Sequence, residues 1–258
     1  MIEVRDIKKK FGDNQVLKGI SSKLEAGKCN MIIGGSGSGK TVLMKCIVGL
    51  MVPDEGSILF DGRDFTHMKY KEKRKLRQEL GMLFQYSALF DSMSVEDNVS
   101  FPLRLFTKMT ARKIRERVDF CLDRVNLENV NKLFPDEISG GMKKRVGIAR
   151  AIALNPKYLF CDEPNSGLDP LTAIVIDKLI KEITEEFKTT TVINTHDMNS
   201  VLEFGDHVVY IYKGNKQWEG TPEEIKKTDD EKVKEFIYAS QFIKDQHESG
   251  SPPLKEEF

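Results

Sequence analysis

The sequence has no net charge, no long hydrophobic run and no closely spaced pair of cysteines. Its 40 Lys and Arg residues balance 40 Asp and Glu residues, so no overall charge favours nucleic acid or an acidic surface as a partner. The longest uninterrupted apolar run, Ile47–Val52, is far too short to span a bilayer. Strand-like alternation starts at Met1 and leaves no room for a signal peptide. These absences predict a cytosolic protein that does not bind nucleic acid.

The cysteines are too scattered to suggest a metal site or a disulfide framework. No CxxC pair occurs, and three of the four lie in apolar runs, which is typical of buried, reduced thiols. They are Cys29, Cys46, Cys121 and Cys161. With 258 residues, 40% of them hydrophobic, the chain can bury one large core or two smaller ones.

Short apolar segments alternate with helical ones through much of the chain, which predicts an α/β fold with a mostly parallel sheet. Near the N-terminus, residues 1–7 and 16–24 alternate as strands do, around a turn at Phe11-Gly12-Asp13-Asn14. The other expected strands are 29–33, 57–60, 81–84, 158–161, 189–194 and 207–212, and the expected helices include 40–50, 71–77, 171–187 and 198–204.

A helical block interrupts this alternation and is read as an inserted subdomain. Ser94 is expected to cap a helix with Asp97 at its third position, and residues 110–127 carry apolar side chains along one helical face. Thr221-Pro222-Glu223-Glu224 predicts another helix start. The expected divisions are a core with the N-terminal strands at 1–85 and 154–220, a helical subdomain at 86–153, C-terminal helices at 221–246 and a flexible tail at 247–258.

A glycine-rich segment, GGSGSGKT, lies between an expected strand and an expected helix. It satisfies the phosphate-loop pattern GxxxxGK[ST], whose glycines let backbone N–H groups turn toward phosphate oxygens. Lys40 is expected to reach the β- and γ-phosphates of a nucleotide, and the Thr41 hydroxyl to ligate Mg²⁺. The expected nucleotide-binding residues are Gly34, Gly35, Ser36, Gly37, Ser38, Gly39, Lys40 and Thr41.

Two adjacent carboxylates, Asp162 and Glu163, follow the expected strand at 158–161. A carboxylate at the C-terminal end of a strand is placed to reach Mg²⁺, so Asp162 is expected to hold the metal. Glu163 is then expected to polarise the attacking water as a general base.

A second glycine-rich turn, Ile138-Ser139-Gly140-Gly141-Met142, precedes another helix. Ser139 is expected to cap a helix running from Met142, and the two glycines to expose backbone N–H groups. Lys143, Lys144 and Arg145 oppose the dipole of that helix, which suggests either a nearby anion or ordinary surface charges. Since one chain with one phosphate loop has no evident need for a second anion-binding helix start, this one is expected to serve a neighbouring chain's nucleotide.

ISGGMKKRVGIARAIA, residues 138–153, resembles the signature motif and following helix of the ATP-binding-cassette (ABC) ATPases. The other motifs stand in that family's order across nearly the whole chain. The resemblance implies a RecA-like core, an N-terminal antiparallel β subdomain and an inserted α-helical subdomain. It also implies that Phe11 stacks on adenine, that the Q-loop residue Gln85 reaches Mg²⁺ and the attacking water, that Asp169 of the D-loop crosses a dimer interface, and that the switch residue His196 contacts the γ-phosphate.

The same resemblance implies a head-to-tail homodimer that drives an integral membrane permease. Each ATP would lie between one chain's phosphate loop and the other chain's signature residues, Ser139, Gly140, Gly141 and Met142. ATP would close the dimer, and hydrolysis would release it.

Two segments narrow the resemblance further. LFQYSALFDSMSVEDN, at 83–98, and SGGMKKR are similar to the ATPase subunit of the Mla (maintenance of lipid asymmetry) phospholipid transport systems. Met142 stands where Gln is commonest, and Asn165-Ser166-Gly167 departs from the usual small-residue run. This likeness implies lipid transport between bacterial inner and outer membranes, a lipid-binding periplasmic component, and a peripheral position on the cytoplasmic face of the inner membrane. The apolar loop 87–90 with Met93 would then receive the permease's coupling helix, or else pack within the subdomain.

Three alternatives remain open on sequence alone. One is an ABC ATPase for another solute, such as an amino acid, a metal chelate or a lipoprotein. A second is an ABC ATPase outside transport, although the chain has no room for a long coiled-coil insertion or a second cassette. The third is a P-loop GTPase or small-molecule kinase, but neither Asn131-Lys132 nor Asn215-Lys216 completes an NKxD pattern. Competition between ATP and GTP for binding would separate the last from the others.

Overall fold

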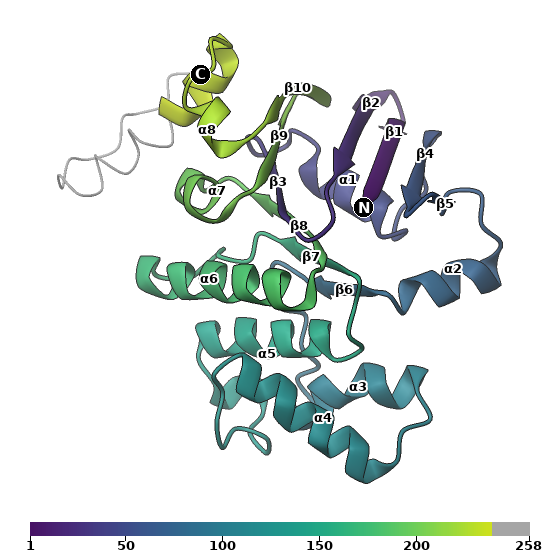
Figure 1. The fold of residues 1–258 in the computed structure, drawn as a ribbon, viewed down its shortest axis with the longest axis vertical. Helices are drawn as coiled ribbons and strands as arrows, with labels where there is room; N and C mark the ends of the chain where they lie inside the picture. Colours follow the sequence, from purple (N-terminus) through teal and green to yellow (C-terminus); the bar gives the residue numbers. More distant parts are fainter. Residues whose placement is uncertain (239–258) are drawn as a thin grey trace.

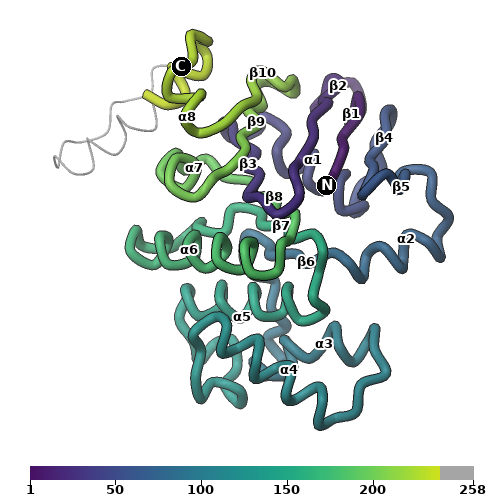
Figure 2. The backbone as a smooth tube through the Cα atoms, in the orientation of Figure 1, coloured from purple at the N-terminus to yellow at the C-terminus, as the bar shows by residue number. Residues whose placement is uncertain are grey.

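The computed structural model describes residues 1–238 as two sheets and a group of helices (Figures 1 and 2). The six-stranded core sheet lies at the centre, a four-stranded sheet packs on one side, and α3, α4 and α5 lie together at the opposite end. The expected tail at 247–258, and the end of the expected C-terminal helical region at 221–246, lie outside the described residues.

The core sheet confirms the expected parallel α/β arrangement. Its strand order is β10-β9-β3-β8-β7-β6, and neighbouring strands are parallel except for β10 against β9. A two-residue turn at Lys213 and Gly214 joins that antiparallel pair, as expected for a hairpin. The strands are β3 (Cys29–Ile33), β6 (Leu80–Leu83), β7 (Tyr158–Asp162), β8 (Thr190–Thr195), β9 (His207–Tyr212) and β10 (Asn215–Gly220).

The central strands β3, β7 and β8 are buried along their whole length, as expected for strands that are covered on both faces. Alternate residues enter two different cores: Met31 and Ile33 pack with the helical end of the molecule, and Ile32 packs with the N-terminal sheet. Cys161 and Phe160 divide in the same way. Because successive side chains of a strand point to opposite faces of the sheet, each strand contributes side chains to both cores. All four cysteines are buried free thiols, as the composition predicts.

The N-terminal sheet is antiparallel, in the order β2-β1-β4-β5. Its strands are β1 (Ile2–Phe11), β2 (Asn14–Leu24), β4 (Glu55–Phe60) and β5 (Arg63–Asp64). α1 (Lys40–Ile47) and α2 (Tyr70–Arg77) follow the phosphate loop and β5. The expectation that the first helix reaches Leu50 is wrong, because Gly49 adopts a left-handed φ of 76° and ends it.

The helical end contains α3 (Val95–Phe106), α4 (Ala111–Arg124), the short 3₁₀ turn η1 (Pro135–Glu137) and α5 (Gly140–Ile152). Ser94 caps α3 by accepting from the backbone N–H of Asp97, as predicted. All of these elements fall within residues 86–153, but the subdomain boundaries themselves remain a prediction.

The remaining helices are α6 (Pro170–Phe187) and α7 (Met198–Phe204), which lie beside the core sheet, and α8 (Pro222–Ile225), which lies near the end of β10 (Figure 1). They are followed by a helical segment at 231–238. Thr221 caps α8 through the predicted capping box with Glu224. Within the described part of the chain, no helix is both long and apolar enough to cross a membrane.

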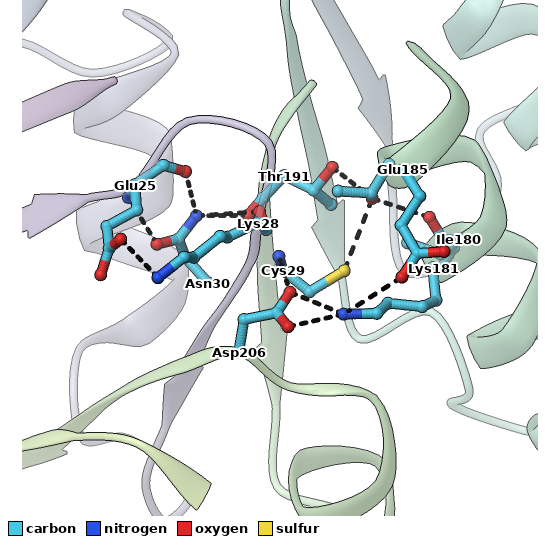
Figure 3. A network of polar contacts seen from close by, with 10 residues as sticks. Glu25, Lys28, Cys29, Asn30, Ile180, Lys181, Glu185, Thr191 and Asp206 are labelled. Atoms are coloured by element: carbon cyan, nitrogen blue, oxygen red, sulfur yellow. Dashed lines mark hydrogen bonds and ion pairs between the residues drawn. The ribbon is translucent and has the colours of Figure 1, made fainter. Parts of the chain in front are cut away.

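A polar network anchors the start of β3, the strand that leads into the phosphate loop (Figure 3). The buried side chain of Asn30 donates to the backbone carbonyls of Glu25 and Thr191. Asp206 accepts from the backbone N–H of Cys29 at 2.8 Å and from Lys181 at 2.6 Å. These bonds fix the strand at the end opposite to the loop.

Candidate active site

The phosphate loop lies between β3 and α1, as predicted, and its lysine is buried. Lys40 Nζ donates to the carbonyl oxygens of Gly34 at 2.7 Å and Gly35 at 3.1 Å. Burial lowers the pKa of Lys40, and the charges of Glu163 and Asp162 partly oppose that shift. The acceptors that the structure gives Lys40 Nζ are neutral carbonyl oxygens, so an anion such as phosphate would offset the cost of burying its charge.

The loop's glycines are required by its shape. Gly39 has a φ of 109°, and a Cβ there would lie 2.9 Å from a methyl carbon of Leu17. At Gly34 a Cβ would meet the carbonyl oxygen of Ile211 at 2.3 Å. Ser38 Oγ is buried and has no partner within the described residues. An orphaned hydroxyl beside a buried lysine fits a polyanionic ligand such as the phosphates of a nucleotide.

The oxygen atoms suited to Mg²⁺ lie beside this loop. Thr41 Oγ1 is 3.3 Å from Asp162 Oδ1, and the same carboxylate oxygen accepts from Asn194 Nδ2 at 2.9 Å. The described residues contain no cluster of three or more His, Cys, Asp or Glu side chains suited to a metal. One carboxylate and one hydroxyl fit Mg²⁺, which completes its coordination with water and substrate phosphates.

The carboxylate of Glu163 pairs with His196. His196 Nδ1 lies 2.8 Å from Glu163 Oε2, and this hydrogen bond raises the pKa of the imidazole. Glu163 itself has a left-handed φ of 49°, a conformation that costs energy for a residue with a Cβ. Strained backbone of this kind is common at active sites, which agrees with the expected role of Glu163.

Gln85 points toward the loop after β7. Its Nε2 donates to Ser166 Oγ at 3.3 Å. Ser166 begins the D-loop motif Ser166-Gly167-Leu168-Asp169, so the Q-loop and the D-loop contact each other. Its predicted role as a Mg²⁺ ligand stays a prediction.

The sequence predicts that Lys144, which opposes the helix dipole, lies near an anion or is an ordinary surface charge. The structure instead buries it, at 4% exposure, where it donates to the carbonyl oxygens of Gln85 and Glu163. Burial accordingly lowers its pKa. Lys144 therefore connects the signature helix to the backbone of two expected catalytic residues.

The signature turn caps its helix as predicted, with Met142 N–H donating to Ser139 Oγ. The helix itself begins at Gly140 rather than at Met142, since the capping bond already encloses the two glycines. A Cβ at Gly141 would lie 2.7 Å from Thr172 Cγ2, so this turn packs against the start of α6. Within residues 1–238 no hydrogen bond joins it to the phosphate loop.

The two remaining predicted residues lie at exposed positions. Asp169 caps α6 by accepting from the backbone N–H of Thr172 at 3.0 Å, and the Thr172 bonds lower its pKa. Phe11 ends β1 and is 48% exposed, with Lys9 Nζ above its ring. A half-exposed aromatic ring is available for stacking on a planar base.

Sequence reasoning missed two polar residues beside the site, Asp177 and Ser200. Both are buried and bonded to Asn165. In the sequence, Asn165 is notable only because Asn165-Ser166-Gly167 departs from the small-residue run that is usual before the D-loop aspartate. Asp177 interrupts the apolar face of α6, and that interruption was the available signal.

Known proteins resemble this chain closely. Residues 17–166 match the ABC transporter family. The chain is 39% identical to the intermembrane phospholipid transport ATP-binding protein MlaF of Haemophilus influenzae, over 92% of this chain and 90% of that protein. It is also 39% identical to the probable ribonucleotide transport ATP-binding protein Mkl of Mycobacterium leprae, over 92% of this chain and 68% of that protein.

Two further similarities bear on function and fold. The methionine import ATP-binding protein MetN of Campylobacter jejuni is 39% identical over 94% of this chain and 77% of its own length. The ATP-binding cassette MJ0796, solved as a dimer bound to ADP and Pi, superposes with a TM-score of 0.79 at 31% identity, over 86% of this chain and 99% of that one. The family match, the relatives and the fold agree: this chain belongs to the ABC transporter family and is an ATPase subunit of that class.

Proposed function

We propose that two copies of this chain bind two ATP molecules with Mg²⁺ and use their hydrolysis to drive a permease that transports phospholipid. In this proposal the phosphate loop holds the ATP of its own chain, and Ser139–Met142 contact the ATP of the other. The dimeric cassette bound to ADP and Pi supports the pairing. The side-chain arrangement around Lys40 and Glu163 supports the chemistry.

The hydrolytic step assigns a separate task to each residue. Lys40 neutralises charge on the phosphates, and Glu163 accepts a proton from the attacking water. His196, held 2.8 Å from Glu163, orients that carboxylate and would contact the γ-phosphate of bound ATP. Thr41 and Asp162 would hold Mg²⁺, which supplies charge neutralisation of the phosphates when bound.

Phospholipid is the cargo that the relatives favour. The MlaF relative is matched over 90% of its length, against 77% for MetN and 68% for Mkl. The observation that carries the proposal is the signature SGGMKKR together with the segment at 83–98, both similar to Mla-type ATPases. A lipid-binding periplasmic component and a position on the cytoplasmic face of a bacterial inner membrane belong to the same proposal.

A hydrophobic groove beside the Q-loop is the proposed docking place for the permease. It encloses about 420 Å³ and its aromatic lining includes Phe84, Phe90, Phe101 and Phe106. Arg150 donates to the carbonyl of Ala88, and Asn98 bonds both backbone groups of Phe90. The loop after Gln85 is therefore held in one shape, as a docking surface that transmits force to Gln85 should be.

The cargo is tested by isolating the chain with its native partners. The complex should be purified gently from native membranes, and its proteins and lipids identified by mass spectrometry. A permease accompanied by a lipid-binding periplasmic subunit, with phospholipid enriched over the bulk membrane, is the expected result. A permease accompanied by an amino-acid-binding protein would overturn the lipid proposal and favour amino-acid import, as the name of the MetN relative suggests.

The groove is tested by a charge on its wall. Phe101→Glu should release the permease during purification, because a carboxylate cannot enter an apolar contact without a large desolvation cost, and basal ATP turnover should stay within about twofold of wild type. Phe120 on α4 is similarly exposed, 40% against 36%, and lies outside the groove lining. Phe120→Glu is therefore the matched control. Retention of the permease by the Phe101 variant would contradict the docking proposal.

A further inference from the structure

A buried polar cluster connects the D-loop to the helix that follows His196. Asp177 on α6 is 5% exposed. Its Oδ2 accepts from Asn165 Nδ2 at 2.7 Å and from Ser200 Oγ at 2.6 Å. Asn165 Nδ2 also lies 3.1 Å from Ser200 Oγ. Side chains from two other segments thus share one carboxylate oxygen of Asp177.

Each of these segments carries a residue of the expected active site. Asn165 lies two positions after Glu163 and four before Asp169, and Ser200 lies four positions after His196. Asp177 lines the same cavity as Glu163 and His196. A shift of the D-loop relative to α7 would therefore stretch the bonds to Asp177 and change the position of His196 relative to Glu163.

Burying the polar groups of this cluster costs free energy of folding. The pKa of Asp177 is raised from 3.8 to about 6, chiefly by burial. The charges of Asp197 and Glu203 contribute to this rise, and the hydrogen bonds from Ser200 and Asn165 oppose it. Asn165 Oδ1 is buried and has no partner within the described residues. Well-packed apolar side chains are often at least as stable as buried charged groups of this kind, so stability alone does not explain the cluster.

We propose that Asp177 is a positioning residue for ATP hydrolysis, which through Asn165 and Ser200 holds the D-loop and the switch histidine in one arrangement. In this proposal Asp177 acts through the two side chains that it binds, Asn165 and Ser200. The proposal deepens the proposed function and rests on the roles given there to Glu163, Asp169 and His196. The phosphate loop is not involved, so binding of ATP to the single chain should not depend on the cluster.

The sign of the stability effect separates a positioning role from a structural one. The pKa of Asp177 is higher in the folded chain than its ordinary value of 3.8, so its ionisation lowers stability as pH rises from about 4 to about 6. Asp177→Asn removes that cost. At pH 7.5 the variant should be at least as stable as wild type.

The experiment compares Asp177→Asn with Asp206→Asn, using the purified full chain with Mg²⁺ and ATP. For Asp177→Asn we expect kcat to fall about tenfold, KM for ATP to stay within about twofold, and the midpoint of thermal unfolding at pH 7.5 to hold or rise. Asp206 also accepts close hydrogen bonds, but at the opposite end of the sheet. Asp206→Asn should lower the unfolding midpoint and leave kcat of the folded chain unchanged.

A double-variant cycle gives an independent readout. Asn165→Ala and Ser200→Ala should each lower kcat, and the pair together should lower it by little more than either alone, because both act through Asp177. Additive losses, or an Asp177→Asn enzyme with kcat within about twofold of wild type, would overturn the inference. If Glu163→Gln and His196→Ala also leave turnover intact, the proposed catalytic roles fail instead.

Discussion

The two glycine-rich helix starts of this chain look alike in sequence and differ in structure. Before α1, Gly34, Gly37 and Gly39 have φ values of 150°, 73° and 109°, and no side chain caps the helix. Before α5, Ser139 caps the helix by accepting from Met142 N–H, and Gly140 and Gly141 are ordinary helical residues within the first turn. The first start is a bent loop around a buried lysine, and the second is a regular helical turn whose first two residues are glycines.

The difference shows that glycine serves two physical purposes here. In the phosphate loop it permits backbone conformations that a Cβ would forbid. In the signature turn it removes bulk, since Gly141 lies against Thr172 and a Cβ at Gly140 would have only Leu168 nearby, at 3.9 Å. Because the two glycines have no side chains, another molecule can approach the backbone of this turn closely. This is consistent with the proposed action of the turn on the ATP of a partner chain.

The largest expected effect comes from Glu163→Gln. Loss of the general base should lower turnover about 100-fold or more, while ATP binding persists because the phosphate loop is intact. The two helix starts should then stay closed around uncleaved ATP. Phosphate release and size-exclusion chromatography with ATP measure the two effects, and near-normal turnover would rule out the assignment of Glu163.

Ser139→Arg, compared with Lys40→Met, tests whether the two starts serve different chains. Arginine at position 139 should block approach of a partner's ATP and lower hydrolysis about 100-fold, with ATP affinity of the single chain unchanged. Lys40→Met should weaken that affinity itself, because the lysine belongs to the binding loop. Equilibrium binding of a fluorescent ATP analogue to the monomer distinguishes them. A parallel loss of affinity in both variants would contradict action in trans.

A smaller effect tests packing at the second start. Gly141→Ala places a Cβ near Thr172 Cγ2 and should destabilise the nucleotide-free chain by about 1 kcal/mol, as small overpacking does. Gly140→Ala, where the space is open, should cost less or stabilise the helix. Thr172→Ser removes the methyl carbon and keeps the hydroxyl, so it should restore the midpoint of thermal unfolding in the Gly141→Ala background. Absence of that rescue would mean that the contact is not the cause.

The smallest effect concerns the pH dependence of the His196 pair. Glu163 raises the pKa of His196 above its ordinary 6.5, so the ion pair contributes to stability below pH 6.5 and is lost as pH rises through the raised value. Glu163→Gln should return the pKa of His196 toward its ordinary value. NMR titration of the imidazole measures this, and an unchanged pKa would show that the contact is absent in solution.

Local patterns predicted much of the fold. Cys29–Ile33, Met198–Phe204 and His207–Tyr212 occur with the expected bounds, because apolar runs, caps and turn residues act within a few positions. The prediction was wrong at the end of a helix, since α1 stops before Gly49 instead of reaching Leu50. It also missed the two-residue strand Arg63–Asp64, which is a strand only because it pairs with β4.

The site was predicted less completely, for the same reason. Lys40, Thr41 and Asp162 follow from motifs whose chemistry is local. The prediction that Lys144 faces an anion or solvent is wrong, because the helix-dipole argument considers one helix alone. Its partners are the carbonyls of Gln85 and Glu163, which lie on other segments.

The sequence by itself determined the parallel sheet, the phosphate loop, the capped signature turn and the resemblance to ABC ATPases, since these depend on spacing and on the conformations that glycine and capping residues allow. Only the tertiary structure decided that Asn165 bonds to Asp177 and Ser200, that Gln85 faces Ser166, and that Lys144 is buried. Those outcomes depend on which distant segments share a buried space, where each polar group must find a partner or raise the free energy of the fold.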